Sequence, residues 1–371
     1  MTPDGDRTSV TLTSGREPDA ALGAPRCSVI IPCRNEEKYI ARCLDSIIAN
    51  GHPKNRLEVL VVDGLSEDGT RDIVGTYTRR YPFIRLLDNT RKITPAAMNV
   101  GLGQAKGDFI VKMDAHATYP ADYIEKSVTY LLDYAADNVG GVWTIAPASN
   151  GTVARTIAHA LAHSFASGNA PVKVGARGLR WTDTVAFGCY RRSVFERVGF
   201  WNEDLAGSSD LDFNRRLRAA GGRILLVPQI TVNYYADGDL ASFWRHNFAD
   251  GVWATYVLKF RSRAFSWRHW APLALVAAVI SLTGVAVAVP AVRTFSVGII
   301  GAYTVANLGA STHLALRHRR LGYLVIAPVV FAIRHAAHGL GALHGLLLLL
   351  VPGVHWKGRR TRVVKAKSEA R

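Results

Sequence analysis

Apolar residues in the first half of the chain fall into short runs that alternate with helical patterns. The runs CSVIIPC (27–33), LEVLVV (57–62) and FIVKM (109–113) are rich in β-branched residues and lead into polar turns, which predicts buried strands. The segment after the first run places apolar residues from Ile40 to Ile48 on one helical face, and another predicted helix carries Pro95 near its first turn. This alternation predicts βαβ units, and therefore an α/β domain with a mostly parallel sheet covered on both faces.

Beyond residue 260 the pattern changes to long apolar stretches. The stretch from Ala271 to Pro290 has no charge and about the length needed to cross ~30 Å of hydrocarbon. Residues 295–316 form a second stretch that is rich in Gly and Ala, and residues 321–351 form a third, which Arg334 and several histidines interrupt. We expect two spans, followed by either a third span or a re-entrant segment.

The charge of the chain follows the apolar stretches. Lys and Arg number 45 against 29 Asp and Glu, a formal charge of +16. Such a surplus is typical of nucleic-acid binding or of contact with anionic lipid. Because the basic clusters at 261–268, 317–320 and 357–371 flank the apolar stretches, we expect membrane lipids and no nucleic acid as partners. The positive-inside rule then places these clusters, and the α/β domain, in the cytosol of a multi-pass protein of the cell membrane.

These patterns divide the chain into five segments. The expected segments are a disordered polar tail at 1–25, the α/β domain at 26–240, an amphipathic interface segment at 241–268, a transmembrane region at 269–356 and a basic cytosolic tail at 357–371. In the interface segment, Trp244, Trp253 and Tyr256 are expected at headgroup depth, although an ordinary packed helix is an equal alternative. Four cysteines without a C-x-x-C pair indicate reduced thiols.

The ends of the predicted strands carry the candidate chemistry. Asp63 ends one strand and can accept a hydrogen bond from a nucleoside ring N–H or a ribose hydroxyl, with Ser66 and Asp68 in the same turn. The chain lacks the glycine-rich phosphate loops of common nucleotide-binding motifs in this region. A pair of Asx-type turns that only end the strands is the alternative interpretation.

Two further groups of residues complete the candidate site. Asp114 and His116 stand two positions apart at another strand end, where they can hold Mg²⁺ or Mn²⁺ against a diphosphate, and the imidazole favours Mn²⁺. Asp210 lies at the start of a predicted helix, where it can accept a proton from a hydroxyl group. The neighbouring Asp212 is as well explained by the helix dipole.

The motifs SVIIPCRNEEKYI, EVLVVDGLSEDGT, ITPAAMNVGLGQAKGDFIVKMDAH and AGSSDLDFNRRLRAAGGRI, in this order, resemble the inverting family-2 glycosyltransferases with a GT-A fold. The resemblance is closest to the ExoA-like branch of exopolysaccharide biosynthesis. It covers residues 26 to about 260, and more loosely the membrane region, where RHAAHGLGALHGLL is similar to the C-terminal segment of that branch.

The resemblance implies a role for each matching residue. Asp210 would be the general base, and Asp114 and His116 would stand at the first and last positions of the D-x-D-type metal motif. The residues expected to bind the donor are Pro32, Arg34, Glu36, Asp63, Ser66, Asp68, Lys92, Asn99 and Asp114. The chain departs from the family in having D-A-H for D-x-D, Ser209 where many relatives have Glu, and no Q-x-x-R-W motif.

The expected activity is non-processive transfer of a hexose from a UDP-sugar, with UDP-glucose as the first candidate, to a polyprenyl-diphosphate-linked saccharide. Other polysaccharide-assembly enzymes are further expected partners. A processive polysaccharide synthase is one alternative. A catalytically inactive sugar-nucleotide-binding scaffold is the other.

Overall fold

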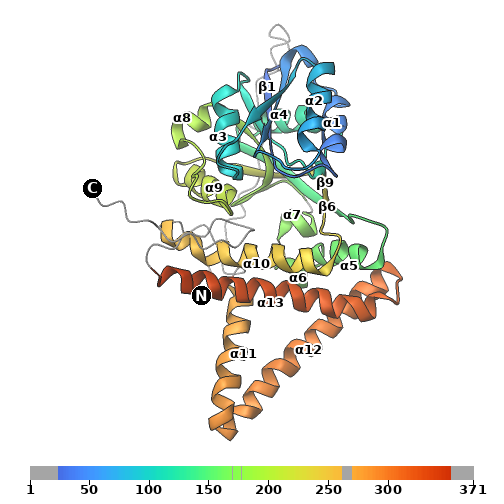
Figure 1. Cartoon of the computed structure of the whole chain (residues 1–371), viewed down its shortest axis with the longest axis vertical. Coiled ribbons are helices and arrows are strands. Elements are labelled where there is room, and N and C mark those ends of the chain that lie inside the picture. Colours follow the sequence, from blue (N-terminus) through green and yellow to red (C-terminus); the bar gives the residue numbers. More distant parts are fainter. Residues whose placement is uncertain (1–23, 169, 177, 261–269, 352–371) are drawn as a thin grey trace, which may run out of the picture. The chain divides into compact units, whose positions relative to one another are not determined.

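The computed structural model describes residues 24–168, 170–176, 178–260 and 270–351. The expected tails therefore lie almost wholly outside the described residues, and the basic cluster at 261–268, which ends the interface segment, lies wholly outside them. The chain divides into two compact units (Figure 1). We call residues 1–144, 175–203 and 209–234 the sheet unit, and residues 145–174, 204–208 and 235–371 the helical unit.

The sheet unit is built on one mixed sheet with the strand order β3-β2-β1-β4-β8-β6-β9-β5, and β7 pairs with β9. The strands are β1 (Cys27–Cys33), β2 (Leu57–Asp63), β3 (Ile84–Asp88), β4 (Phe109–Lys112), β5 (Ala117–Thr118), β6 (Asn138–Ala146), β7 (Arg180–Trp181), β8 (Ala186–Arg191) and β9 (Ile224–Tyr235). Strands β1 to β4 are parallel, whereas β8 runs antiparallel to both β4 and β6. The predicted βαβ units are therefore confirmed, and antiparallel strands extend the sheet beyond β4.

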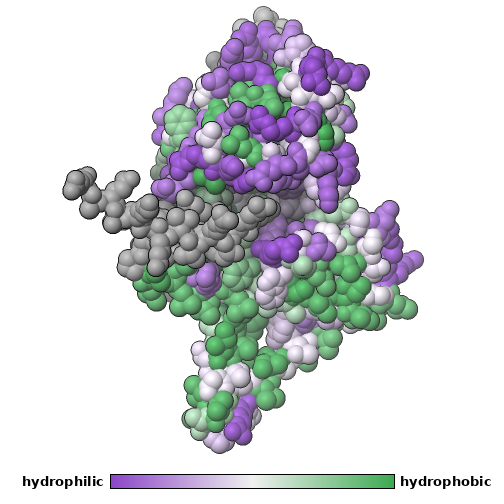
Figure 2. Space-filling model, in the orientation of Figure 1, coloured by the Kyte–Doolittle hydropathy of each residue, from purple (hydrophilic) through white to green (hydrophobic). Residues whose placement is uncertain are grey.

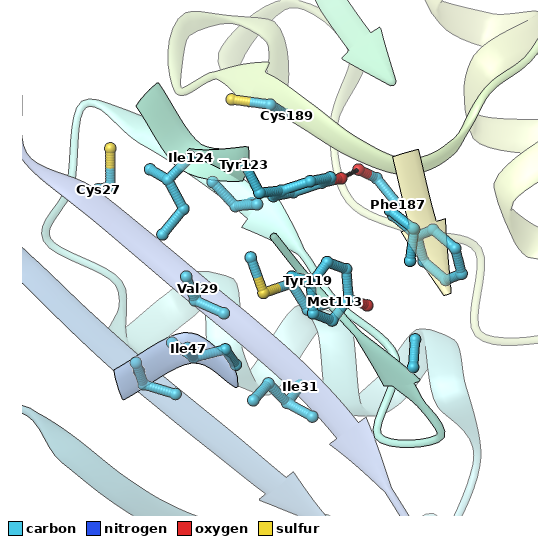
Figure 3. Packing of buried hydrophobic residues seen from close by; sticks show 14 of the residues in the cluster. Cys27, Val29, Ile31, Ile47, Met113, Tyr119, Tyr123, Ile124, Phe187 and Cys189 are labelled. Carbon is cyan, nitrogen blue, oxygen red and sulfur yellow. Dashed lines mark hydrogen bonds between the residues drawn. The ribbon is translucent and has the colours of Figure 1, made fainter. Parts of the chain in front are cut away.

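Helices cover both faces of this sheet because side chains alternate along each strand. Val29 and Ile31 of β1 join the main core with α1 (Ile40–Ile48), α2 (Thr70–Arg80) and α4 (Tyr123–Asp133), as Figure 3 shows in part. Ile30 points the other way and contacts Gly101 of α3 (Thr94–Gln104), where a larger residue would clash with its side chain. Pro95 lies in the first turn of α3, as predicted.

Two further helices of the sheet unit pack next to β8. They are α8 (Ser193–Val198) and α9 (Ser209–Ala219), and between them an aromatic cluster forms in which Trp201 stacks on Phe213 with ring centroids 4.6 Å apart. Tyr190 of β8 meets both rings edge-on. This cluster fixes α9, and so the residue at its first turn, against the end of the sheet.

The helical unit contains α5 (Thr152–Leu161), α6 (Ser164–Ser167), α7 (Pro171–Val174), α10 (Leu240–Tyr256), α11 (Ala271–Ala288), α12 (Pro290–His318) and α13 (Tyr323–Leu349). Segment 145–174, expected within the α/β domain, belongs here because the apolar face of α5 packs against residues of α12 and α13. Leu161, for example, shares a core with Leu314 and Phe331.

The α10 helix is a packed helix along most of its length. Thr255 donates a hydrogen bond to the carbonyl oxygen of Ala342 in α13 at 2.7 Å. Trp253 and Tyr256 are buried, whereas Trp244 is exposed. The α10 helix packs against α13, and these two rings pack against Leu205, which agrees with the packed-helix alternative. The headgroup depth of the three aromatic residues stays a prediction.

Two described helices, α11 and α13, are long and apolar enough to cross a membrane. The first matches the span expected at 271–290. The second span, expected at 295–316, lies in α12, which does not meet the same criterion of length and hydropathy. The third stretch, expected as a span or a re-entrant segment, lies in α13 and does meet it. In the helical unit, α11 and α12 form a hairpin and α13 lies along α10 (Figure 1).

Candidate active site

The turns after β1 and β2 carry four of the residues expected to bind the donor, Arg34, Glu36, Ser66 and Asp68. The carboxyl ends of these two parallel strands lie at the same edge of the sheet. Asp63 is fully buried, and its carboxylate accepts hydrogen bonds from the backbone N–H of Ser66 at 2.9 Å and from Nη1 of Arg71 at 2.7 Å. The Ser66 hydroxyl donates to the same carboxylate. Asp63 thus holds the turn after β2 in place, as the Asx-turn interpretation predicts.

The loop after β1 docks onto this turn. The backbone N–H of Asn35 donates to the Ser66 hydroxyl at 2.8 Å, and the backbone N–H of Glu36 donates to the Thr70 hydroxyl at 2.8 Å. Asn35 has φ of 57°, a left-handed conformation that Asn tolerates better than most residues. Asp68 accepts from the hydroxyl and the backbone N–H of Thr70, the first residue of α2. The two loops therefore form one hydrogen-bonded rim.

Arg34 and Lys92 both lie close to Gly64. A side chain at position 64 would approach Cβ of Arg34 at 3.2 Å and Cα of Lys92 at 3.4 Å. Arg34 pairs with Glu67 at 3.3 Å, and Pro32 is the residue of β1 aligned with Val62 of β2. The structure therefore brings three of the expected donor-binding residues, Pro32, Arg34 and Lys92, to the same end of the sheet as Asp63.

Asn99, expected to bind the donor, makes hydrogen bonds within the sheet unit. Its amide group exchanges hydrogen bonds with the backbone of Trp201 and donates to Oε1 of Glu203 at 2.8 Å. Glu203 also pairs with Arg91. Asn99 thus ties α3 to the segment that precedes α9, which is a structural role.

Asp114 and His116 follow β4, as predicted. The Asp114 side chain is 24% exposed, and its backbone N–H donates to the Tyr119 hydroxyl at 2.6 Å. Nδ1 of His116 lies 3.3 Å from Oε1 of Glu36, and its ring meets Tyr234 edge-on. Glu36, expected at the nucleoside, is therefore a partner of the expected metal ligand.

Lys112, the last residue of β4, is not among the candidate residues predicted from the sequence. Its Nζ lies 2.5 Å from Oδ2 of Asp210 and 3.4 Å from Oδ1 of Asp114. Burial alone lowers the pKa of Lys112, but the two facing carboxylates outweigh burial and hold this pKa above its usual range. A lysine that ends an otherwise apolar strand was the available signal, since a buried ammonium requires a counter-charge.

Asp210 stands in the first turn of α9 with its side chain 34% exposed. Its Oδ2 contacts Lys112, whereas its Oδ1 is buried and has no hydrogen-bond partner among the described residues. Asp212, one half-turn on, is buried and accepts from Nε of Arg216 at 2.9 Å. The two aspartates therefore differ: Asp212 is tied within its helix, and Asp210 faces the end of β4.

The residues after β4 can bind a cation that takes its remaining ligands from a substrate. Among the described residues, no three His, Cys, Asp or Glu side chains are grouped to hold a metal ion by themselves. A cation that bridges the phosphates of a nucleotide needs only one or two protein ligands. Asp114 can supply a carboxylate oxygen, and the carboxylate of Glu36 beside His116 is the kind of partner that orients an imidazole ligand.

Comparison with known proteins identifies a family to which much of the chain is similar. Residues 28–200 match the model of the Glycosyl transferase family 2. The chain is 29% identical over 322 residues to the succinoglycan biosynthesis protein ExoA of Rhizobium meliloti (strain 1021), covering 86% of this chain and 94% of the relative. It is 25% identical over 327 residues to a dolichyl N-acetyl-alpha-D-glucosaminyl phosphate 3-beta-D-2,3-diacetamido-2,3-dideoxy-beta-D-glucuronosyltransferase of Methanococcus voltae, covering 86% and 97%.

A solved structure supports the fold. The mannosyltransferase PcManGT from Pyrobaculum calidifontis, in complex with GDP-Man and Mn²⁺, superimposes with a TM-score of 0.57 at 24% identity, covering 88% of each chain. The match over residues 28–200 shows that this chain contains a glycosyltransferase family 2 domain, and the solved structure shows that the fold is of the GT-A type.

Proposed function

We propose that this chain is a membrane-anchored, inverting and non-processive glycosyltransferase. It transfers a hexose from a UDP-sugar, with UDP-glucose the first candidate, to a polyprenyl-diphosphate-linked saccharide in the synthesis of a cell-surface glycan. The observation that carries the proposal is the grouping of Asp114 and Asp210 around Lys112, with Oδ1 of Asp210 lacking a partner among the described residues. A buried polar atom without a partner calls for an explanation, and a role in the working complex supplies one.

The reaction needs a general base for the acceptor hydroxyl and a positive charge that stabilises the leaving diphosphate. The acceptor hydroxyl oxygen forms a bond to the anomeric carbon as the bond from that carbon to the diphosphate breaks, and the electron pair leaves with the nucleoside diphosphate. Asp210 receives the hydroxyl proton. Asp114 and His116 would hold Mg²⁺ or Mn²⁺, which would supply positive charge at the leaving diphosphate.

The proposed membrane attachment depends on the helical unit. The hairpin of α11 and α12 exposes large apolar side chains such as Phe295, 70% exposed, and Val305, 72% exposed. Figure 2 shows hydrophobic residues gathered over this hairpin. Such a surface is expected to be covered by lipid. Arg317, Arg319 and Arg320 follow at the end of α12, where the positive-inside rule places them in the cytosol together with the active site.

Support for a lipid-linked acceptor comes from the relatives. One is named as a succinoglycan biosynthesis protein and another as a transferase acting on a dolichyl-linked sugar phosphate. An acceptor carried on a polyprenyl lipid requires its enzyme to work at the membrane. The apolar helices α11 and α13 fit that requirement.

The test is a donor screen with membranes that contain the full chain. We expect nucleotide release from at least one sugar nucleotide when a lipid-linked acceptor is present, and loss of release with a chelator or in Asp210→Asn. A folded protein that releases no nucleotide from any donor would favour the inactive scaffold. Products of many added sugars on one acceptor would favour the processive synthase.

A further inference from the structure

Lys112 occupies the centre of the active site without being accessible to a substrate. Its side chain is 6% exposed, and its strand, β4, lies between β1 and β8 in the interior of the sheet. The ammonium group lies within 3.4 Å of both active-site carboxylates. A group so buried and so engaged is poorly placed to bind a donor or an acceptor. Its effect on the reaction must therefore pass through Asp114 and Asp210.

The two contacts of Lys112 are unequal. The nitrogen is at hydrogen-bond distance from Oδ2 of Asp210, 2.5 Å away, but farther from Asp114, at 3.4 Å. Charge-assisted hydrogen bonds of this length are strong and directional. Lys112 therefore holds Asp210 by one carboxylate oxygen, Oδ2, and Oδ1 is the other acceptor atom of that carboxylate. The contact of Lys112 with Asp114 is longer and weaker.

The two carboxylates that contact Lys112 are both able to bind a divalent cation. A divalent cation attracted to Asp114 would also attract Asp210, because both side chains reach the same ammonium nitrogen. Carboxylate oxygens are the ligands that Mg²⁺ and Mn²⁺ prefer. An Asp210 recruited as a metal ligand would no longer accept a proton from the acceptor hydroxyl.

We propose that Lys112 is a positioning residue that holds Asp210 away from the cation bound at Asp114 and so reserves Asp210 for the acceptor. This inference rests on the proposed function, since it assigns the base role to Asp210. It predicts a property that catalysis alone does not reveal: removal of the Lys112 charge makes the protein bind Mn²⁺ more tightly, through Asp210.

The test measures Mn²⁺ binding to the full chain in detergent micelles by titration calorimetry, without donor. We expect Lys112→Met to bind Mn²⁺ about tenfold or more tightly than the unchanged protein, on the scale of changes to groups that orient metal ligands. The gain should vanish in Lys112→Met combined with Asp210→Asn. Lys112→Arg, which keeps the charge, should leave the affinity close to that of the unchanged protein.

A kinetic measurement accompanies the titration. In Lys112→Met, kcat should fall about 10- to 100-fold while KM for the donor changes far less, because the base and not the donor pocket is disturbed. Lys126→Met is the matched control. It removes a lysine that pairs with Asp122 at 2.6 Å on the exposed side of α4, and it should change neither the Mn²⁺ affinity nor kcat.

Two results would overturn the inference. One is an unchanged Mn²⁺ affinity in Lys112→Met, and the other is a tighter affinity that persists in the double variant. Thermal unfolding checks that each variant is folded, and Lys112→Gln replaces Lys112→Met if the latter unfolds. A different result would refute the proposed function, namely that the unchanged protein releases no nucleotide. The Mn²⁺ titrations would still test the role of Lys112.

Discussion

Nδ1 of His116 lies 3.3 Å from Oε1 of Glu36, so the loop after β4 and the loop after β1 meet across 80 residues of sequence. This contact joins a residue expected at the cation to a residue expected at the nucleoside. Carboxylates that contact the second ring nitrogen of a metal-bound histidine fix its tautomer and orientation. Glu36 therefore has a defined chemical task even if it never touches the donor.

This contact gives the first prediction. Glu36→Gln keeps the size of the side chain but removes the charge that orients His116, so the affinity for Mn²⁺ should fall about 10- to 100-fold. Titration of the full chain with Mn²⁺ measures the change. Glu196→Gln, on the exposed surface of α8, is the control and should bind as the unchanged protein does. Equal affinities in the two variants would show that His116 does not hold the cation with the help of Glu36.

The second prediction separates two neighbouring aspartates of α9. Asp210→Asn should lower kcat about 10²- to 10⁴-fold, the usual range for loss of a general base, and it should also lower the stability, because only Asp114 then neutralises the buried Lys112. Asp212→Asn should lower the thermal stability and leave kcat nearly unchanged, because Asp212 is buried and accepts a hydrogen bond from Arg216. Nucleotide-release kinetics and thermal unfolding of both variants check this. An Asp210→Asn protein with full activity would remove the base assignment.

The strands and the positions of their terminal aspartates could be predicted from sequence, because both are local features. Apolar β-branched runs indicated β1, β2 and β4, and Asp63 and Asp114 follow directly from where those runs end. The partner of Lys112 could not be predicted in the same way. Asp210 is 98 residues away, and only the packing of α9 against the sheet brings the two side chains together.

The assignment of helices to units could not be predicted either. Segment 145–174 was predicted as part of the α/β domain because it directly continues β6. Its apolar face nevertheless packs against residues of α12 and α13, about 150 positions later in the sequence. Asn99 shows the same limit. Its position in a family motif suggested donor binding, but its amide is engaged by Trp201 and Glu203, which no local pattern indicates.

The third prediction concerns the start of α10 and its dependence on pH. Asp239 caps this helix, and its carboxylate accepts from the backbone N–H and the hydroxyl of Ser242, both at 2.8 Å. The hydrogen bond from the Ser242 backbone lowers the pKa of Asp239 below its ordinary value. The stabilisation is therefore complete above the unfolded-state pKa of about 3.9 and is lost as the pH falls towards the lower folded-state value.

Two substitutions test this cap by thermal unfolding in detergent. Asp239→Ala should cost about 1 kcal/mol at neutral pH. Asp239→Asn can still accept from Ser242 but cannot titrate, so it should stay near the stability of the unchanged protein at pH 7 and lose less stability than that protein between pH 5 and pH 3. A parallel decline of both proteins over that range would show that Asp239 does not contribute.

The fourth prediction concerns the close packing of α13 against α10. A Cβ atom at Gly341 would overlap the carbonyl oxygen of Phe248, which belongs to the α10 backbone and cannot move aside as a flexible side chain can. Small residues permit such close approach of helices, as is common in membrane proteins. Gly341→Ala should therefore destabilise the protein by about 1–3 kcal/mol, the usual cost of overpacking.

Gly298 in α12 provides the matched control for Gly341. It is exposed, and a Cβ atom there meets nothing within 4 Å, so Gly298→Ala adds only helix propensity and should stabilise by about 0.5–1 kcal/mol. Thermal unfolding of the two variants in the same detergent measures the difference. Since both changes add one methyl group to a helix, an opposite sign isolates the backbone contact between α10 and α13. Equal effects would mean that this contact is looser in the working protein than in the structure.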